Sequence, residues 1–310
     1  MPGGSITILK RDSLRLLGSL IGYLSDGFVF NKGYGKESLF KFSQTVKKQP
    51  MKGVTGCLNS HLDGARNAYG LYNRSNDKLG RMFMKKGNLP DCANCGLTPQ
   101  EKVCMNPKGK GAKGCPTLTE KKLAGRAKKE YQLAKVREFA RKASIQEGEC
   151  YAERDRRPYV MHATKPRIQE IGEFALKMGY NRLGLVFCVG LSKEAMIVNQ
   201  LLKSQDFETV SVACKVGSVP KEEIGIKESE KIFIGEYESM CNPILQAAIV
   251  NDAKTDFNIL LGLCVGHDSL FFKYSEAPTT VLAVKDRVTG HNPLGPIYLL
   301  GNYYSWLKKP

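Results

Sequence analysis

The chain has 310 residues and a formal net charge of +17, with 42% hydrophobic and 25% charged residues. These fractions are typical of a folded globular protein, long enough for one large or two ordinary domains. The sequence has no run of about 18 apolar residues and no apolar stretch that leads to a small-residue cleavage site. We therefore expect no membrane partner, no secretory leader and a cytoplasmic location.

The excess of Lys and Arg is compatible with nucleic acid as a partner, because a basic surface attracts phosphates. The basic residues are dispersed, however, and few aromatic residues lie between them. A solvated surface is the simpler interpretation, and nucleic acid is the less favoured partner.

Residues 1–83 have no sustained apolar period of about 2 or 3.6, the spacings that indicate strands and helices. We predict a poorly defined N-terminal extension here, with disorder as one interpretation. Cys57 has no obvious partner in this segment, and Met84 would be a natural start for a compact protein.

Four cysteines follow within a short stretch, in the pattern C-x2-C-x8-C-x10-C: Cys92, Cys95, Cys104 and Cys115. Thiolates at such spacing suit a tetrahedral zinc site or an iron–sulfur cluster. Four protein ligands leave no open coordination position, so the predicted role is structural. Four unrelated free cysteines are the alternative. A thioredoxin-like pair fits less well, because no strand–helix pattern surrounds the first two cysteines.

A basic helix is predicted from Glu120 to Ser144, with Thr119 as its N-cap. Its basic face could contact nucleic acid, although such faces are more often simply solvated. This helix and the four-cysteine module together make up residues 84–150.

Residues 151–310 alternate between helical and strand patterns. Gly179 is expected to end the first helix, Ser192 to cap the second, and Asn242-Pro243 to open the third. Ile244, Leu245, Ala248 and Ile249 are expected to form the inner face of that third helix. The predicted strands cover residues 183–190, 209–217, 231–235, 257–266 and 280–285. Such alternation predicts an α/β domain with a Rossmann-like, mostly parallel sheet and helices on both faces.

Cysteines recur at the ends of these strands. Cys188, Cys214 and Cys264 each lie late in a predicted strand, and Cys241 directly precedes the helix that begins with Asn242-Pro243. Because parallel strands end at one edge of the sheet, where ligands bind, these thiols could converge on a cofactor, with His267 beside them. The predicted occupant is an iron–sulfur cluster rather than zinc. Four independent core cysteines are the alternative, since cysteine is often buried.

Polar residues accompany these cysteines. Asp268 could orient His267, and Asp286 could do the same for His291. Lys285 and Arg287 could hold an anionic substrate. Turn formation is the alternative interpretation for these residues. Neither a glycine-rich dinucleotide motif nor a phosphate loop is present, so nucleotide binding has no support.

Seven motifs in one order give the sequence a resemblance to a family. They are CANCG at 92–96, GCP at 114–116, GLVFCVGL at 184–191, VACKVG at 212–217, CNP at 241–243, GLCVGHD at 262–268 and VKDRVTGHNP at 284–293. Over residues 84 to 300 the chain resembles an uncharacterised prokaryotic family of predicted metal-binding proteins, known as a domain of unknown function. The resemblance implies metal binding by the cysteines and no particular activity. The family is largely from anaerobes, which would suit an oxygen-sensitive cluster.

Three functional hypotheses follow. The first is a metal-binding cytoplasmic protein with a four-cysteine zinc or iron–sulfur site and a second, redox-active cysteine site that serves a small-molecule or redox partner. The second is a zinc-dependent nucleic-acid-binding or structural module without catalysis. The third is thiol–disulfide exchange. Whether the protein is an enzyme is left open.

Overall fold

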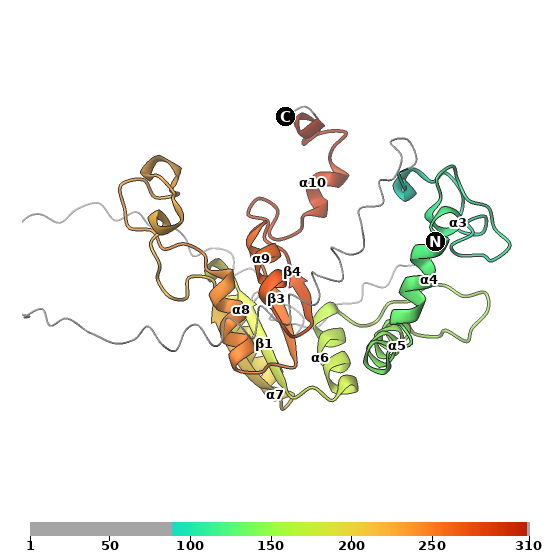
Figure 1. Cartoon of the computed structure of the whole chain (residues 1–310), viewed down its shortest axis with the longest axis horizontal. Helices are drawn as coiled ribbons and strands as arrows, with labels where there is room; N and C mark the ends of the chain where they lie inside the picture. Colours follow the sequence, from blue (N-terminus) through green and yellow to red (C-terminus); the bar gives the residue numbers. More distant parts are fainter. Residues whose placement is uncertain (1–88, 309–310) are drawn as a thin grey trace, which may run out of the picture. The chain divides into compact units, whose positions relative to one another are not determined.

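The computed structural model describes residues 89–308, so the predicted extension over residues 1–83 lies outside the described part of the chain. A four-stranded sheet forms the centre of the α/β domain (Figure 1). Its strands are β1 (Arg182–Phe187), β2 (Glu208–Ala213), β3 (Phe257–Leu261) and β4 (Thr279–Ala283). Their order is β2-β1-β3-β4 and every neighbouring pair is parallel, which confirms the predicted parallel sheet.

Helices cover both faces of this sheet (Figure 1). On one face α6 (Arg167–Met178) and α7 (Ser192–Ser204) pack against alternate side chains of the central strands, including Leu183, Leu185 and Ile259. On the other face α8 (Pro243–Asp252) and α9 (His267–Tyr274) pack against Val186 and Leu260. Successive strand residues point to opposite faces, so both faces of β1 and β3 are buried and both strands are almost entirely apolar.

The sheet order has a consequence for ligand binding. The chain passes from β1 outward to β2, and then crosses back to β3 on the other side of β1. The connection reverses direction between β1 and β3, and crevices at such switch points are where open α/β sheets bind ligands, beyond the carboxyl ends of the strands. Cys188 follows β1 directly, and Cys264 lies three residues after β3 ends.

The basic helix predicted over residues 120–144 is in fact two helices, α4 (Lys121–Glu130) and α5 (Ala134–Glu149). The break has a local cause. The guanidinium of Arg137, in α5, donates to the carbonyl oxygens of Tyr131 and Gln132 and to the Gln132 side chain. These bonds satisfy carbonyls that a continuous helix would have paired internally. The predicted cap is also wrong, since Glu120 precedes α4 and makes no side-chain capping bond.

The strand predicted at 231–235 is absent. The segment instead forms a turn between the 3-10 helix Glu228–Glu230 and Ser239, which makes an isolated β-bridge with Pro220. Its polar groups are satisfied locally. The Glu238 carboxylate accepts from the Ile232 amide at 2.9 Å, and the Lys231 ammonium pairs with Glu222 and Glu228. A second short 3-10 helix, Lys221–Ile224, lies in the same excursion.

Two helix starts differ in how well the sequence predicts them. Asn242 caps α8 as predicted, because its Oδ1 accepts from the Leu245 amide at 3.0 Å. Ser192 is the first residue of α7 rather than its cap, and its hydroxyl donates to the Val189 carbonyl at 2.6 Å. The predicted inner face of α8 is also wrong, since its buried residues are Pro243, Gln246, Ala247 and Val250.

Gln246 explains the altered face of α8. Its side chain is fully buried, and its Nε2 donates to the carbonyl oxygens of Val212 at 2.8 Å and Phe187 at 3.3 Å. These bonds satisfy the amide nitrogen, whereas the Oε1 of Gln246 is buried without a hydrogen-bond partner among residues 89–308. The two bonds hold α8 against the strand ends that carry Cys188 and Cys214.

The four-cysteine segment is short and has little regular structure: the 3-10 turn Cys92–Asn94, a Lys102↔Lys110 bridge and α3 (Pro116–Thr119). No residue from 89 to 145 is buried, so this stretch has no apolar core within the described part of the chain.

The chain ends with α10 (Leu294–Tyr298) and the 3-10 helix Ser305–Lys308. Among residues 89–308, no helix combines the length and the apolar character that crossing a membrane requires.

Candidate functional site

The sheet-edge cysteines are those predicted at the carboxyl edge of the sheet: Cys188, Cys214, Cys241 and Cys264. Strand register brings the first two of them together. Phe187 at the end of β1 pairs with Ala213 at the end of β2, so Cys188 and Cys214 are the next residues on neighbouring strands. Both side chains are buried and both lie on the α8–α9 face. The Cys214 amide donates to the Phe187 carbonyl at 2.9 Å, which extends the ladder into this pair. The two thiols are in hydrogen-bonding contact.

Cys241 reaches the same place from the start of α8. The backbone amide of Asn242 donates to the Cys214 carbonyl at 2.7 Å and so ties the helix start to the end of β2. The sulfur atoms of Cys214 and Cys241 lie 3.8 Å apart, and the structure contains no disulfide among the described cysteines. Three thiols from β1, β2 and α8 therefore form a connected group.

Cys264 stands at the other side of the switch point, close enough for its charge to act on Cys241. The Arg287 guanidinium, which follows β4, donates to the Cys264 sulfur at 3.0 Å. The turn that carries Cys264 depends on Gly262, which has φ +70°, and a Cβ there would lie 2.1 Å from Leu191 Cδ1. Four elements thus contribute the four predicted cysteines.

The thiols have different proton affinities. The hydrogen bond with Cys214 lowers the pKa of Cys241 to about 7, and the charge of Lys215 acts in the same direction. The hydrogen bond with Cys214, followed by burial, raises the pKa of Cys188. For Cys214 the bond with Cys188 lowers the pKa, but contact with Cys241 and burial outweigh it, so the pKa is raised. Cys241 is therefore the readiest to become a thiolate.

Cations surround these thiols. Lys215 follows Cys214, and its ammonium donates to the Ser239 carbonyl. The Lys285 ammonium lies near the backbone at Gly190 and acts on Cys188. Sequence reasoning identified Lys285 and Arg287 and missed Lys215, although its position directly after Cys214 offered a clue. Together with Arg287, these positive charges favour anions or thiolates at this edge.

His267, the first residue of α9, adds an unsatisfied nitrogen. Its Nδ1 is buried and has no hydrogen-bond partner within residues 89–308. Burial, and then the charge of Lys215, lowers the pKa of the imidazole. A neutral imidazole with a free buried nitrogen can act as a ligand or acceptor.

The other polar residues predicted near the site form turns instead. Asp268 accepts from the amides of Gly266 and Ser269 and does not bond to His267. Asp286 accepts from the amides of Val288 and Thr289, and His291 Nδ1 accepts from the Asp286 amide. In the structure Asp268, Asp286 and His291 therefore stabilise turns through local hydrogen bonds with backbone amides.

The first four cysteines are free thiols in an open segment: Cys92 and Cys104 are exposed, whereas Cys95 and Cys115 are half-buried. Neither here nor at the sheet edge, nor anywhere else in residues 89–308, do three His, Cys, Asp or Glu side chains stand in positions that could hold one metal ion. The structure gathers the sheet-edge thiols without arranging them as a coordination shell. The zinc and iron–sulfur assignments thus stay predictions, as does nucleic-acid binding by the exposed basic helix α4.

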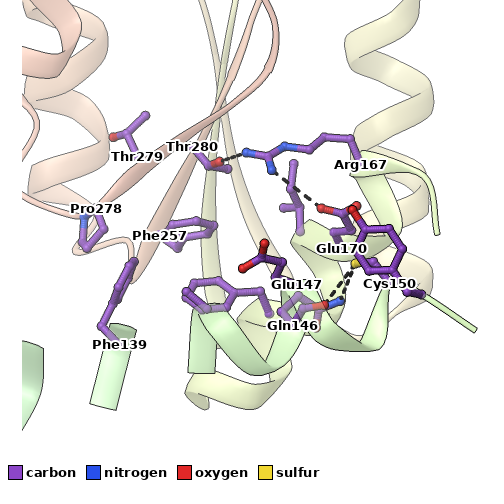
Figure 2. Close-up of a pocket in the computed structure, with 14 residues that line it drawn as sticks. Phe139, Gln146, Glu147, Cys150, Arg167, Glu170, Phe257, Pro278, Thr279 and Thr280 are labelled. Atoms are coloured by element: carbon purple, nitrogen blue, oxygen red, sulfur yellow. Dashed lines mark hydrogen bonds and ion pairs between the residues drawn. The ribbon is translucent and has the colours of Figure 1, made fainter. Parts of the chain in front are cut away.

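A second candidate site, which the sequence did not indicate, is a cavity of about 480 Å³ between α5, α6 and the starts of β3 and β4 (Figure 2). Phe139, Phe174 and Phe257 supply its apolar wall, and Glu147 and Glu170 supply carboxylates. It opens at the amino ends of the strands, whereas the cysteines lie at their carboxyl ends.

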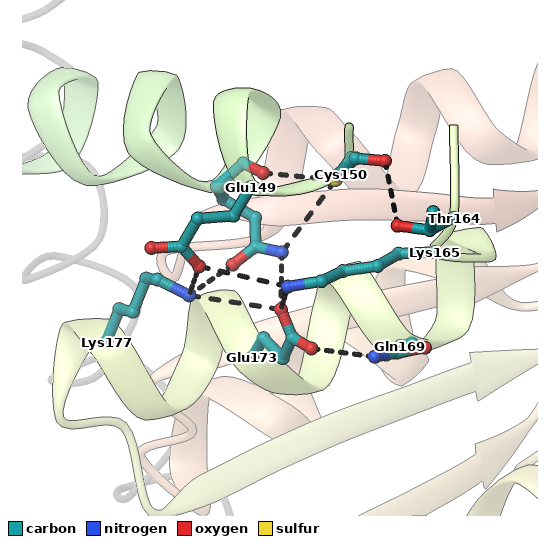
Figure 3. Close-up of polar contacts among 8 residues, drawn as sticks. Glu149, Cys150, Thr164, Lys165, Gln169, Glu173 and Lys177 are labelled. Carbon is teal, nitrogen blue, oxygen red and sulfur yellow. Dashed lines mark hydrogen bonds and ion pairs between the residues drawn. The ribbon is translucent and has the colours of Figure 1, made fainter. Parts of the chain in front are cut away.

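A polar network joins α5 to α6 beside this cavity (Figure 3). Lys165 pairs with Glu173 at 2.5 Å, and Lys177 pairs with Glu149 at 2.7 Å. Gln146 bridges them, since its Nε2 donates to Glu173 and its Oε1 accepts from Lys177. Hydrogen bonds from Lys165 and then Gln146 lower the pKa of Glu173 to about 2, and the same Lys165–Glu173 bond raises the pKa of Lys165.

Fold and site together define an α/β protein with a four-stranded parallel sheet and a cysteine-lined carboxyl edge. The chain belongs to the family described as "Protein of unknown function (DUF1847)", whose model matches residues 115–282. That range includes Cys115 and all four sheet-edge cysteines. An uncharacterized protein of Methanocaldococcus jannaschii is 51% identical over 145 residues, which is 47% of this chain and 71% of that protein. No solved structure matches the chain.

Proposed function

We propose that the protein binds metal through its cysteines, with one thiolate-ligated centre at the carboxyl edge of the sheet and a second one held by Cys92, Cys95, Cys104 and Cys115. The ligands of the first would come from Cys188, Cys214, Cys241 and Cys264, with His267 as a further donor. Zinc and an iron–sulfur cluster are the two candidate occupants, and an iron occupant would make the centre redox-active.

The 3.8 Å separation of the Cys214 and Cys241 sulfur atoms carries this proposal. The edge of a tetrahedron is roughly 1.6 times its centre-to-corner distance, so a Zn–S bond of about 2.3 Å sets neighbouring sulfurs about 3.8 Å apart. A single ion would fit between these two thiols as they stand. A four-iron cluster gives each terminal thiolate a separate iron and holds the thiolates further apart, whereas a two-iron cluster places two thiolates on each iron. The distance therefore fits a single ion or one iron of a two-iron cluster, and it disfavours a four-iron cluster. The remaining ligands would come from side-chain rotation of Cys188, Cys264 or His267.

Charge supports the same interpretation. A divalent ion with four thiolates carries a net charge of about −2, which is costly to bury without compensation. Lys215, Lys285 and Arg287 supply positive charge next to Cys241, Cys188 and Cys264 respectively. The unsatisfied Nδ1 of His267 is also explained if a ligand occupies the space before it.

The lack of buried residues in the four-cysteine module supports the second metal centre. Because no residue from 89 to 119 is buried, this segment of the described chain has no buried apolar core to stabilise it. Segments of this kind depend on a metal or disulfides, and the free cysteines are available as ligands.

Cobalt(II) titration of the full chain tests the sheet-edge centre. Replacement of Cys92, Cys95, Cys104 and Cys115 by Ser removes the module's ligands and isolates the sheet-edge centre. In that background we expect one Co²⁺ per chain, with thiolate-to-cobalt charge-transfer absorption. Adding Cys241→Ser should weaken binding at least tenfold, while Cys150→Ser, which removes a buried thiol outside the group, should not. Equal loss in both variants, or no Co²⁺ binding, would refute the proposal.

The same distance favours one other candidate function, reversible disulfide formation between Cys214 and Cys241. The two thiols would give up two protons and two electrons to an external disulfide, which becomes two thiols. Treatment of the metal-free chain with oxidised glutathione, followed by peptide mapping, tests it. A Cys214–Cys241 bridge in a protein that binds no Co²⁺ would favour this function over metal binding.

A further inference from the structure

The cavity at the amino ends of β3 and β4 has the properties of a ligand site independent of the cysteines. Its volume of about 480 Å³ lies within the range of roughly 300–1,000 Å³ that small-molecule sites occupy. Three separate elements, α5, α6 and the sheet, form it, and the ion-pair network of Figure 3 fixes α5 to α6. The cavity is therefore set by the fold rather than by one loop.

Its wall is aromatic. The rings of Phe139 and Phe174 are 5.1 Å apart in an edge-to-face arrangement, and those of Phe174 and Phe257 are 5.6 Å apart. All three line the cavity (Figure 2). Aromatic faces of this kind bind apolar or planar groups, and they also attract a cation above the ring.

The charges of the lining are acidic. Glu147 and Glu170 carry two negative charges and Arg167 one positive charge, on a chain with a formal net charge of +17. Arg167 is already engaged, since its Nη2 donates to Thr280 Oγ1 at 2.7 Å and its guanidinium lies 3.7 Å from Glu170. The Glu147 carboxylate has no hydrogen bond or ion pair with any residue from 89 to 308. A cation is thus a better electrostatic complement to this lining than an anion is.

The one thiol in the lining does not point to covalent chemistry. Cys150 is 6% exposed, and its Sγ donates to the Gln146 carbonyl at 3.0 Å. Burial, and then the nearby Glu170, raises the pKa of this thiol. A neutral, hydrogen-bonded thiol is a poor nucleophile, so the cavity is suited to binding.

We propose that this cavity binds a small organic cation, an apolar or aromatic group that carries one protonated or quaternary nitrogen. The apolar group lies against Phe139 and Phe174, and the nitrogen lies between the ring faces and the carboxylates of Glu147 and Glu170. This site does not depend on metal binding at the other edge of the sheet.

Calorimetric titration of the full chain with three probes of one skeleton tests the proposal. The probes are 2-phenylethylammonium, neutral 2-phenylethanol and the anion 3-phenylpropionate. We expect the cation to bind at least tenfold more tightly than the alcohol, and the anion to bind more weakly than both. Equal binding of the three probes, or no binding of the cation, would overturn the proposal.

Two glutamate variants test whether the cation binds in this cavity. Glu147 is exposed, so Glu147→Gln should fold normally and weaken binding of the cation severalfold without changing binding of the alcohol. Glu138→Gln is the matched control, because Glu138 is in the same helix and pairs with Lys142 outside the cavity. It should leave both affinities unchanged. If Glu138→Gln weakens binding of the cation as much as Glu147→Gln does, the binding is a general surface effect and the proposal fails.

Discussion

At the scale of single residues, position relative to a strand end decides what each cysteine can do. Cys150 directly follows α5 and donates to the Gln146 carbonyl, whereas Cys214 contacts two other thiols. Both are buried, and composition alone treats them alike. Strand register distinguishes them, because only Cys188 and Cys214 continue paired strands on one face of the sheet.

The cap of α8 gives a prediction at this scale. Asn242→Ala removes the acceptor for the Leu245 amide and should lower the free energy of unfolding by about 1 kcal/mol, the usual effect of losing an N-cap. Asn242→Asp keeps an acceptor oxygen and should stay within about 0.5 kcal/mol of the original chain. Urea unfolding of the metal-free protein measures both. An equal loss in the two variants would show that the cap does not stabilise α8.

Glycines in the turn after β3 give a second prediction. Gly262 and Gly266 both have positive φ, but only a Cβ at Gly262 meets a neighbour, Leu191, at 2.1 Å. Gly266→Ala should cost about 1 kcal/mol of backbone strain, and Gly262→Ala should cost about 2–4 kcal/mol because overpacking is added. Chemical denaturation compares them, and indistinguishable values would mean that Leu191 moves aside freely.

At the scale of elements, the junction of α5 and α6 depends on charge. The lowered pKa of Glu173 means that its ionised form is stabilised by folding. Its contribution is complete above the ordinary value of 4.5 and is lost as the pH falls from there toward about 2. Lys165, with a raised pKa, contributes below its ordinary value of 10.5 and loses its effect as the pH rises beyond it.

The resulting prediction concerns Glu173→Gln. Because the pair is partly solvated, the substitution should lower the free energy of unfolding by only about 1 kcal/mol at pH 7. The difference from the original chain should shrink steadily between pH 4.5 and the acid limit of the folded state. Urea unfolding across this range measures it, with Glu138→Gln as a surface control. A difference that stays constant with pH would contradict the assigned protonation.

The sequence predicted those elements that local signals specify. Apolar runs located the four strands, and Gly179 and Asn242-Pro243 marked a helix end and a helix start correctly. The break between α4 and α5 was missed because it depends on Arg137 reaching back to Tyr131 and Gln132. The apolar run at residues 232–234 favours a strand, but these side chains are exposed around a turn held by Glu238, so the strand predicted at 231–235 is wrong.

The sites were predictable to different degrees. Convergence of the strand-end cysteines followed from parallel strands, since all carboxyl ends lie at one edge. Strand order, and with it the switch point between Cys188 and Cys264, required the structure. The cavity could not be foreseen, because Phe139, Phe174 and Phe257 are far apart in sequence and meet only through packing.

At the scale of the whole molecule, two parts differ in what can stabilise them. The α/β domain buries both faces of its central strands, whereas the four-cysteine segment buries no residue. We expect a chelator to make residues 89–120 sensitive to trypsin while the α/β domain stays resistant. Limited proteolysis with mass spectrometry checks this. Unchanged cleavage after removal of metal would show that the segment does not need metal to stay folded.

Metal content of the anaerobically purified full chain tests the central claim most directly. Elemental analysis with acid-labile sulfide should find metal at both cysteine groups, and Cys214→Ser/Cys241→Ser should lose the share held at the sheet edge while keeping the rest. If acid-labile sulfide falls together with the metal in this variant, the sheet edge holds a cluster. If the metal falls while the sulfide content is unchanged, the sheet edge holds a single ion such as zinc. A double variant that retains the full metal content of the original chain would contradict the account and return the sheet-edge cysteines to a packing role.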